Sequence, residues 1–479
     1  MPSWWKSLLG GRTEARVPAA SVRSPTATDT LRRLLTVPPT TEAWKEATRW
    51  VQDANSGEHD FLVEMGLGLV EAWPDALRSF MFHYPELLEP DALPPWWPWV
   101  KRLETEECAL DDSGVARVLA FVAELAVTEL ALPSSELTVS TIEQLCASSA
   151  LSAVVRLNLS CNDLGPAGAA ALVASPNPVA LKALDLSSNE LGDAGVATLA
   201  GWPALRDIER LELGDNAIGD EGVGALAASR TSQSLQHIDL DGNELTDAGV
   251  VALVGTPALA ALRHLNLGDA ELTERAVVAL TRARFAPFLH TLRLSCSGLE
   301  DTGLTRLLCA DPFSALTDLD LMANRLTAAS AQVLARSTVV GQLKRLVLSN
   351  NRLEANGVRA LLDAAPWSAM QHLDLRRNGL GDAGARALAE SDGLAALTSL
   401  DLASNGLGAQ GVAALCGWRQ LAGVADLNLS DNPIGAAGAH ALAESPSAAG
   451  LTRLRVDRSI GGEALRLLET KLPGCDVWS

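Results

Sequence analysis

A leucine-rich pattern that returns every 27 residues constrains the fold of this chain more than any other feature. Its fullest form, L-x-x-L-x-L-x-x-N-x-L, occurs at 181–191, 235–245, 316–326, 343–353 and 397–407, with isoleucine as the second hydrophobic residue at 238. With that second residue as a marker, the pattern runs at constant spacing through fourteen turns, from Leu103 to Leu454. Fourteen turns in one register indicate a repeat architecture rather than a single globular core.

Each turn combines two hydrophobic periods. The L-x-L part alternates apolar and polar residues and predicts a short strand with one buried face. The part that follows, such as GDAGVATLA at 192–200, predicts an amphipathic helix of small residues. Because no hairpin signal separates the turns, each strand should run parallel to the one before it.

A glycine and an asparagine also recur. The glycine lies in the helical part of most turns, as at Gly195 and Gly384, where the missing side chain should let neighbouring helices approach closely. The asparagine, as at Asn189 and Asn405, lies where the chain leaves the strand. Its amide can bond buried backbone groups that the bend leaves unpaired.

These motifs resemble the ribonuclease-inhibitor-like class of leucine-rich repeats, which includes Ran GTPase-activating proteins and bacterial repeat proteins. The resemblance covers residues 100–460. It implies an α/β solenoid of fourteen turns, a right-handed horseshoe with a parallel sheet on the concave side and helices on the convex side. It implies little about function, because such folds host many different partners.

The two ends depart from the repeat. Residues 1–27 are polar and should form a flexible tail, and 28–99 carry helical patterns and most of the tryptophans, as a small helical N-terminal capping domain would. A solenoid needs such a cap over its first strand, although an independent ligand-binding module is the alternative. Residues 461–479 end in a charged helix and should form the C-terminal cap.

Composition excludes several classes of protein. The chain has 58 Asp and Glu against 38 Lys and Arg, a formal charge of −20, which disfavours nucleic acid and anionic membranes. The seven cysteines show no C-x-x-C spacing, so neither a disulfide framework nor a zinc site is expected. The start, MPSWWKSLLGGR, has too short an apolar stretch for a secretory signal. We expect a cytoplasmic monomer.

No catalytic motif is recognisable. Phosphate-binding, nucleophile-elbow and metalloprotease signatures are missing, so we expect no enzymatic activity and no cofactor. The repeat should stack His237 on His264, next to Asp239 and Asn266, a grouping that could hold a divalent metal. Because acids are common in this part of such repeats, we favour ordinary surface polarity and predict no metal.

The side chains that flank the strand leucines should line the concave surface, with equal positions stacked on neighbouring strands. Acids dominate this strip over 154–272, and arginines and lysines dominate it over 289–378. We therefore predict a non-enzymatic scaffold whose acidic, then basic, concave surface binds a protein partner. The predicted contact residues on this surface are Asp185, Glu212, Asp239, Asp241, Arg293, Asp320, Arg345, Arg376 and Arg377. A regulator of a small GTPase is the alternative that the resemblance allows.

One place breaks the repeat in mid-array. Two consecutive turns lack the asparagine and carry Ala270 and Ser297 instead, which should leave backbone groups without their usual partners. The segment between these turns holds Phe285 and Phe288. We predict that both phenylalanines contact a partner. The alternative is that they only fill space between strand and helix.

Overall fold

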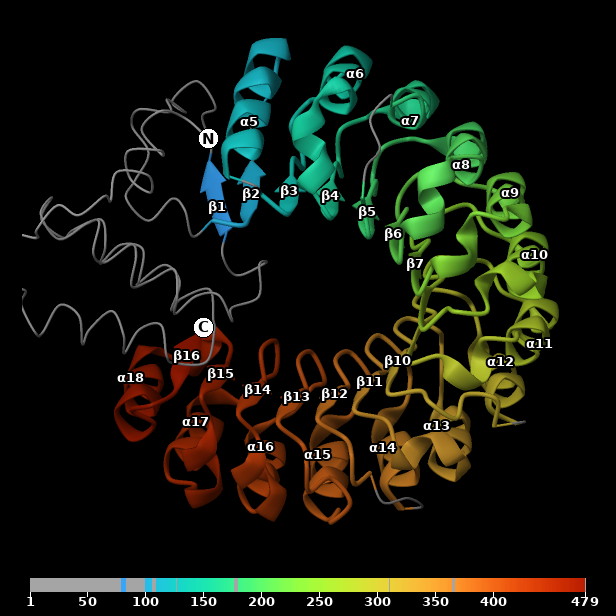
Figure 1. The fold of residues 1–479 in the computed structure, drawn as a ribbon. Coiled ribbons are helices and arrows are strands. Elements are labelled where there is room, and N and C mark those ends of the chain that lie inside the picture. Colours follow the sequence, from blue (N-terminus) through green and yellow to red (C-terminus); the bar gives the residue numbers. More distant parts are fainter. Residues whose placement is uncertain are drawn as a thin grey trace, which may run out of the picture. The chain divides into compact units, whose positions relative to one another are not determined.

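The computed structural model describes residues 79–82, 100–105, 109–125, 127–175, 180–309, 311–363 and 367–478. The chain divides into two compact units, Met1–Glu212 and Leu213–Ser479. In each unit parallel strands alternate with helices, and the helices line one side of the sheet (Figure 1). This is the α/β leucine-rich-repeat solenoid that the sequence predicts. The predicted flexible tail lies outside the described residues, as does most of the predicted N-terminal cap.

The first unit contains six described strands in the order β1 to β6, each parallel to the next. The strands are β1 Ser79–Phe82, β2 Arg102–Thr105, β3 Glu129–Ala131, β4 Arg156–Asn158, β5 Ala183–Asp185 and β6 Arg210–Glu212. The helices are α5 Asp112–Leu125, α6 Val139–Ala147, α7 Gly165–Val173 and α8 Gly192–Ala200, with 3₁₀ turns η5 Ser149–Ala153 and η6 Pro203–Asp207.

The second unit continues the same alternation from β7 to β16. The strands are β7 His237–Asp239, β8 His264–Asn266, β9 Thr291–Arg293, β10 Asp318–Asp320, β11 Arg345–Val347, β12 His372–Asp374, β13 Ser399–Asp401, β14 Asp426–Asn428, β15 Arg453–Arg455 and β16 Asp476–Trp478. The helices are α9 Asp220–Ala228, α10 Asp247–Gly255, α11 Glu274–Thr281, α12 Glu300–Leu308, α13 Ala328–Arg336, α14 Glu354–Asp363, α15 Gly381–Ala389, α16 Ala409–Cys416, α17 Gly435–Ala443 and α18 Gly462–Lys471. The 3₁₀ turns are η7 Ser232–Ser234, η8 Pro257–Leu259, η9 Ala286–Phe288, η10 Thr338–Gly341, η11 Arg419–Gly423, η12 Pro446–Gly450 and η13 Arg458–Ile460.

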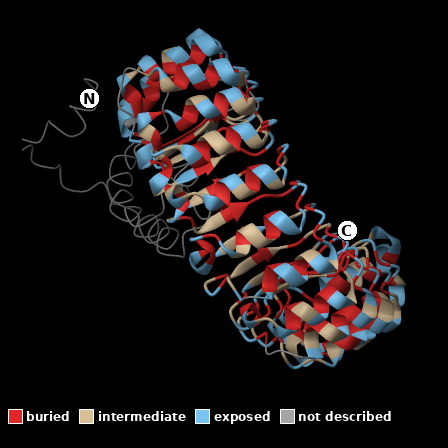
Figure 2. Ribbon diagram, turned by 90° about the vertical axis from the view of Figure 1, so that its right-hand side faces the viewer, coloured by how far each residue is buried: buried red, intermediate tan, exposed pale blue. Residues whose placement is uncertain are grey.

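The core of each unit lies between its sheet and its helices. All fourteen marker residues are at most 2% exposed, and each lies inside one of the strands β2 to β15. Burying a leucine of this kind stabilises the fold by about 2 kcal/mol. Figure 2 shows the resulting pattern, with buried and exposed segments alternating along the helices that are clearly in view.

Two strands lie outside the 27-residue register. Phe80 of β1 pairs with Leu103, and Val477 of β16 pairs with Leu454, so both separations are 23 residues. Our prediction of helix is wrong for Ser79–Phe82, which forms β1. At the other end the charged helix is present as α18, and β16 follows it and covers the edge of β15.

At the recurring glycines, an added side chain would first meet a leucine of the same repeat, and not the neighbouring helix that we expected. A Cβ atom added to Gly384 would lie 2.7 Å from Cβ of Leu380 in its own repeat, and 3.7 Å from Cα of Ala355 in the preceding helix. The equivalent leucines, Leu164 and Leu353, lie four residues before Gly168 and Gly357. The glycine therefore makes room first for the leucine that opens its own helix, and second for the neighbouring helix.

Candidate interaction surface

Each strand of three residues presents two side chains on the face that the helices leave uncovered. These side chains flank the buried marker, as His237 and Asp239 flank Ile238. Together with the charged side chains of the bend that follows each strand, they form the surface that we call the strand face. Pairing is in register, so that Asp239 stacks on Asn266 and Asp318 stacks on Arg345. The strand face therefore consists of parallel columns, and successive side chains within a column are about 4.8 Å apart.

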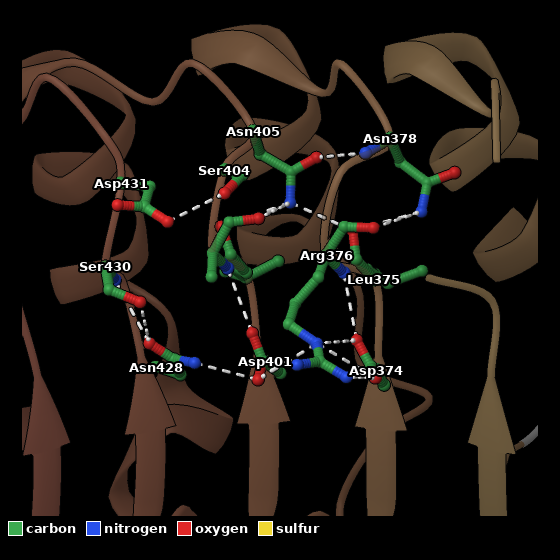
Figure 3. Close-up of polar contacts among 12 residues, drawn as sticks. Asp374, Leu375, Arg376, Asn378, Asp401, Ser404, Asn405, Asn428, Ser430 and Asp431 are labelled. Atoms are coloured by element: carbon green, nitrogen blue, oxygen red, sulfur yellow. Dashed lines mark hydrogen bonds and ion pairs between the residues drawn. The ribbon is translucent and has the colours of Figure 1, made fainter. Parts of the chain in front are cut away.

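Beyond strands β4 to β7 and β10 to β14, the asparagines form the ladder that the sequence predicts, part of which is drawn in Figure 3. Asn405 is 2% exposed, and its Nδ2 donates to the carbonyls of Leu375, Leu402 and Ala403 at 2.9–3.2 Å. Its Oδ1 accepts from the backbone N–H of Asn378 at 2.9 Å. One amide thus satisfies backbone groups of two successive turns, which holds the strand ends rigidly under the strand face.

Four carboxylates gather on the strand face of the second unit, and we call them the acidic cluster: Asp215, Asp239, Asp241 and Asp269. Burial raises the pKa of Asp241 to about 6, and the charges of the other three cluster members add to this shift. Oδ2 of Asp239 accepts a hydrogen bond of 2.9 Å from Nδ2 of Asn266. Within the described residues, no lysine or arginine forms an ion pair with the cluster.

Glycines make room for this crowding of like charges. A Cβ atom at Gly268 would lie 1.7 Å from Oδ1 of Asp241, and one at Gly242 would lie 2.1 Å from Oδ1 of Asp215. Oδ1 of Asp241 is buried without a hydrogen-bond partner among the described residues. The acidic cluster is therefore a site of stored electrostatic repulsion that a positive group would relieve.

The predicted arginines of the same unit follow the acidic cluster along the strand face, but they are not equivalent. Arg293 and Arg377 are exposed, Arg345 is half-buried, and none of the three forms an ion pair in the described part of the chain. Arg293 and Arg345 oppose the rise in the pKa of Asp320 that burial causes. These arginines supply the basic part of the strand face.

Arg376 differs from the other arginines, because its charge is used within the protein. Its guanidinium contacts Asp374 at 2.8 Å and Asp401 at 3.4 Å (Figure 3). These carboxylates raise the pKa of Arg376. Arg376 is exposed and stays a predicted contact residue, but its charge is already paired with a buried acid, Asp374, and a half-buried acid, Asp401.

The two predicted contact residues of the first unit line a pocket. Asp185 and Glu212 lie on the strand face of β5 and β6, in the wall of a pocket of about 440 Å³. Burial raises the pKa of Asp185, and the charge of Glu212 adds to the rise. Glu212 also forms an ion pair with Arg210. Sequence reasoning found these two acids but missed the pocket and the arginines around it.

The histidines stack as the repeat predicts. The ring centroids of His237 and His264 are 5.3 Å apart, and His290 continues the stack 6.2 Å from His264. Nδ1 of His264 lies 2.9 Å from Oγ1 of Thr291. The three histidine rings therefore stack in a row, while the neighbouring Asn266 is hydrogen-bonded to Asp239.

At the break in the repeat, the two phenylalanines have opposite environments. Phe285 is 1% exposed and belongs to the core, so our prediction of a partner contact is wrong for this residue. Phe288 is 53% exposed, and the guanidinium of Arg263 lies 5.3 Å from its ring centroid. Two carbonyls, of Ala261 and Leu262, hold that guanidinium at 2.8 Å each. Phe288 therefore remains a proposed contact residue.

The missing asparagines are partly replaced. Oγ of Ser297 donates either to the carbonyl of Leu267 or to that of Ser295, each at 3.1 Å, where Asn405 donates to the equivalent pair. The N–H of Leu272 donates to the carbonyl of Ser297 at 3.3 Å. The backbone around Ser297 therefore keeps more of its hydrogen bonds than the sequence predicts. Of the two residues that replace the asparagine, only Ala270 offers no side-chain hydrogen bond.

Comparison with known proteins agrees with this geometry. A family described as "Leucine Rich repeat" matches residues 154–173, 180–200, 204–227, 231–254, 370–389, 395–416 and 426–443. The repeats of this chain are leucine-rich repeats. No curated protein sequence matches the chain. Leucine-rich repeats are generally protein-interaction scaffolds and are typically non-enzymatic.

Two solved structures show similar folds at low identity. The chain is similar to a chain in the crystal structure of the Rad7 and Elc1 complex in yeast, with a TM-score of 0.53, 17% identity, and coverage of 77% of this chain and 88% of that chain. It also matches the TLR13–ssRNA13 complex at a TM-score of 0.37 and 17% identity, covering 82% of this chain and 60% of that chain. At 17% identity the first structure shows a shared fold only, and the TM-score of 0.37 for the second carries no further argument. Among the helices that the structure describes, none combines the length and hydropathy needed to cross a bilayer.

Proposed function

We propose that this leucine-rich-repeat protein is a non-enzymatic scaffold whose strand face in the second unit binds a protein partner of complementary charge. The observation that carries the proposal is the acidic cluster without ion pairs in the described residues, followed along the sheet by Arg293, Arg345 and Arg377. A partner with a basic segment over the cluster and an acidic segment over the arginines would lower the repulsion among the carboxylates and among the arginines.

Three further features support a protein partner. The asparagine ladder keeps the columns in fixed register, so a partner meets a preorganised surface and little ordering entropy is lost on binding. The exposed Phe288, with Arg263 held against its ring, combines an aromatic and an arginine, which are enriched at interface hot spots. The fold also resembles a Rad7 chain that crystallised with a protein, Elc1.

Affinity purification of the full chain with mass spectrometry tests this function. The double variant D239K/D241K should lose the partners that the unchanged chain retains, and R345E/R377E should lose the same ones. E221K is the matched control, because Glu221 is an exposed acid of helix α9. Loss of partners in E221K alone would contradict the proposal. Acceleration of GTP hydrolysis by a captured small GTPase would support the regulatory alternative.

A further inference from the structure

The strand face of the first unit carries an alternating column of charges that is interrupted at one position. The residues immediately before the markers of β2 to β6 are Arg102, Glu129, Arg156, Ala183 and Arg210. Strand pairing places each directly beside the next. Arginine and glutamate alternate over the first three strands, and Ala183 then stands where the alternation would place an acid.

Glu129 shows what an acid does in this column. Its side chain is 7% exposed and forms ion pairs with the arginines on both neighbouring strands, Arg156 and, at 3.9 Å, Arg102. A carboxylate between two arginines at this spacing is therefore accommodated by the fold. Ala183 also has an arginine on each side, Arg156 on β4 and Arg210 on β6, but ends at its methyl group. Each of these arginines holds one ion pair already, Arg156 with Glu129 and Arg210 with Glu212, so a carboxylate above Ala183 would be a second partner for both.

The missing side chain leaves room. The pocket of about 440 Å³ is lined by Arg156, Ala183 and Arg210 on one side and by Asn158, Asp185 and Glu212 on the other. Both arginines keep more than half of their side-chain surface exposed, at 57% and 56%. They can therefore turn toward a group in the pocket without leaving the protein.

We propose that this pocket binds an extended segment of a partner protein, with an Asp or Glu carboxylate entering above Ala183 between Arg156 and Arg210. The inference rests on the proposed function as a protein-binding scaffold and names one contact of the first unit. Asp185 and Glu212 lie two residues farther along their strands, about 7 Å from the arginine column. They repel a second carboxylate and attract a basic side chain. The segment recognised therefore has the pattern acid, any residue, base.

Peptides that carry this pattern test the proposal directly. The probe is Ac-Glu-Ala-Lys-NH₂, and the control is Ac-Gln-Ala-Lys-NH₂, which has the same size without the carboxylate. Ligand-observed NMR with the full chain should give saturable binding of the probe with a dissociation constant of about 1 mM, as expected for a ligand of this size. The control peptide should bind about tenfold more weakly.

Variants assign the contact to the pocket. A183E supplies a tethered carboxylate and should weaken binding of the probe at least tenfold, as should R210Q. S399E adds the same charge at the equivalent position of β13 and should leave probe binding unchanged. In thermal unfolding at low salt, A183E should melt above A183Q, because only the glutamate gains the two arginines.

Equal binding of both peptides, or full binding of the probe by A183E, would overturn the proposal. Neither outcome would touch the proposed function, which depends on Asp239, Asp241, Arg345 and Arg377 of the second unit. Conversely, loss of partner capture only in E221K would contradict that function while selective probe binding would still support the pocket.

Discussion

At the scale of single residues, the buried asparagines satisfy backbone groups at the ends of the strands. Each ladder asparagine replaces the hydrogen bonds that the backbone loses where it leaves the strand. The recurrence of asparagine in the 27-residue pattern is enough to predict this role. The environment of Asp241 was not predictable in the same way. Its crowding depends on Asp215 and Asp269, which come from neighbouring turns, and on the glycines that let them approach.

Replacing a ladder asparagine should be costly. Asn405→Ala removes one amide that serves several backbone groups and should lower the free energy of unfolding by about 2–3 kcal/mol. Ser404→Ala, which removes only an exposed hydrogen bond to Asp431, should change it by less than about 0.5 kcal/mol. Urea denaturation measures both variants. Equal values would show that the amide has no special role.

The two phenylalanines should separate stability from binding. Phe285→Ala empties a buried site and should cost about 3–5 kcal/mol in urea denaturation. Phe288→Ser should leave the unfolding midpoint nearly unchanged and weaken capture of the partner. Normal capture by a stable Phe288→Ser chain would remove this residue from the proposed interface.

The acidic cluster should make stability depend on pH. The pKa of Asp241 in the folded protein, about 6, lies above the ordinary value of 3.8, so protonation favours the folded state. That contribution is complete below about pH 4 and is lost as the pH rises through 6. Asp241→Asn should therefore raise the melting temperature at pH 8 and raise it little at pH 4.

The control for this pH dependence is Glu221→Gln, which removes one negative charge from an exposed helix position. It should shift the melting temperature little at either pH. A gain from Asp241→Asn that is the same at pH 4 and pH 8 would mean that the carboxylate is not destabilised by its neighbours.

At the scale of elements, the sequence predicts strands β2 to β15 and misses those at the two ends. The reason is the register. β1 and β16 pair with their neighbours at a separation of 23 residues, so they do not belong to the 27-residue repeat. The helices were predicted by their small residues. The reason for the recurring glycine was only partly predicted, because the leucine of the same repeat is its nearest neighbour.

Glycine-to-alanine changes in two helices test that packing. An alanine normally stabilises a helix interior by about 1 kcal/mol relative to glycine. Gly224→Ala in α9 should show this gain, because its Cβ would meet nothing within 4 Å. Gly384→Ala in α15 should instead destabilise, because its Cβ would lie 2.7 Å from Cβ of Leu380. A gain at both positions would contradict the packing argument.

At the scale of the whole molecule, each unit is a stack of repeats in which the strand of a regular repeat pairs with the strands before and after it. The C-terminal strand β16 supplies the last neighbour, through hydrogen bonds of 2.8 Å from Asp476 to Thr452 and of 2.9 Å from Val456 to Trp478. Without it, the N–H and C=O groups of β15 would form an open edge, which favours aggregation.

Truncation tests the role of this strand. A chain that ends at Leu472 should melt at a lower temperature and aggregate in light scattering, whereas a chain lacking only Ser479 should behave like the full chain. A soluble and equally stable chain ending at Leu472 would show that β16 is not needed as a cap.

The central claim is that the charged strand face of the second unit binds the partner. Its most direct test is the dissociation constant of the captured partner at rising salt, from about 50 mM to 500 mM NaCl, for the unchanged chain, D239K/D241K and E221K. Because the face is charged and poor in apolar groups, binding to the unchanged chain and to E221K should weaken at least tenfold over this range. D239K/D241K should bind weakly throughout. A dissociation constant that is independent of salt and equal in all three proteins would contradict the account.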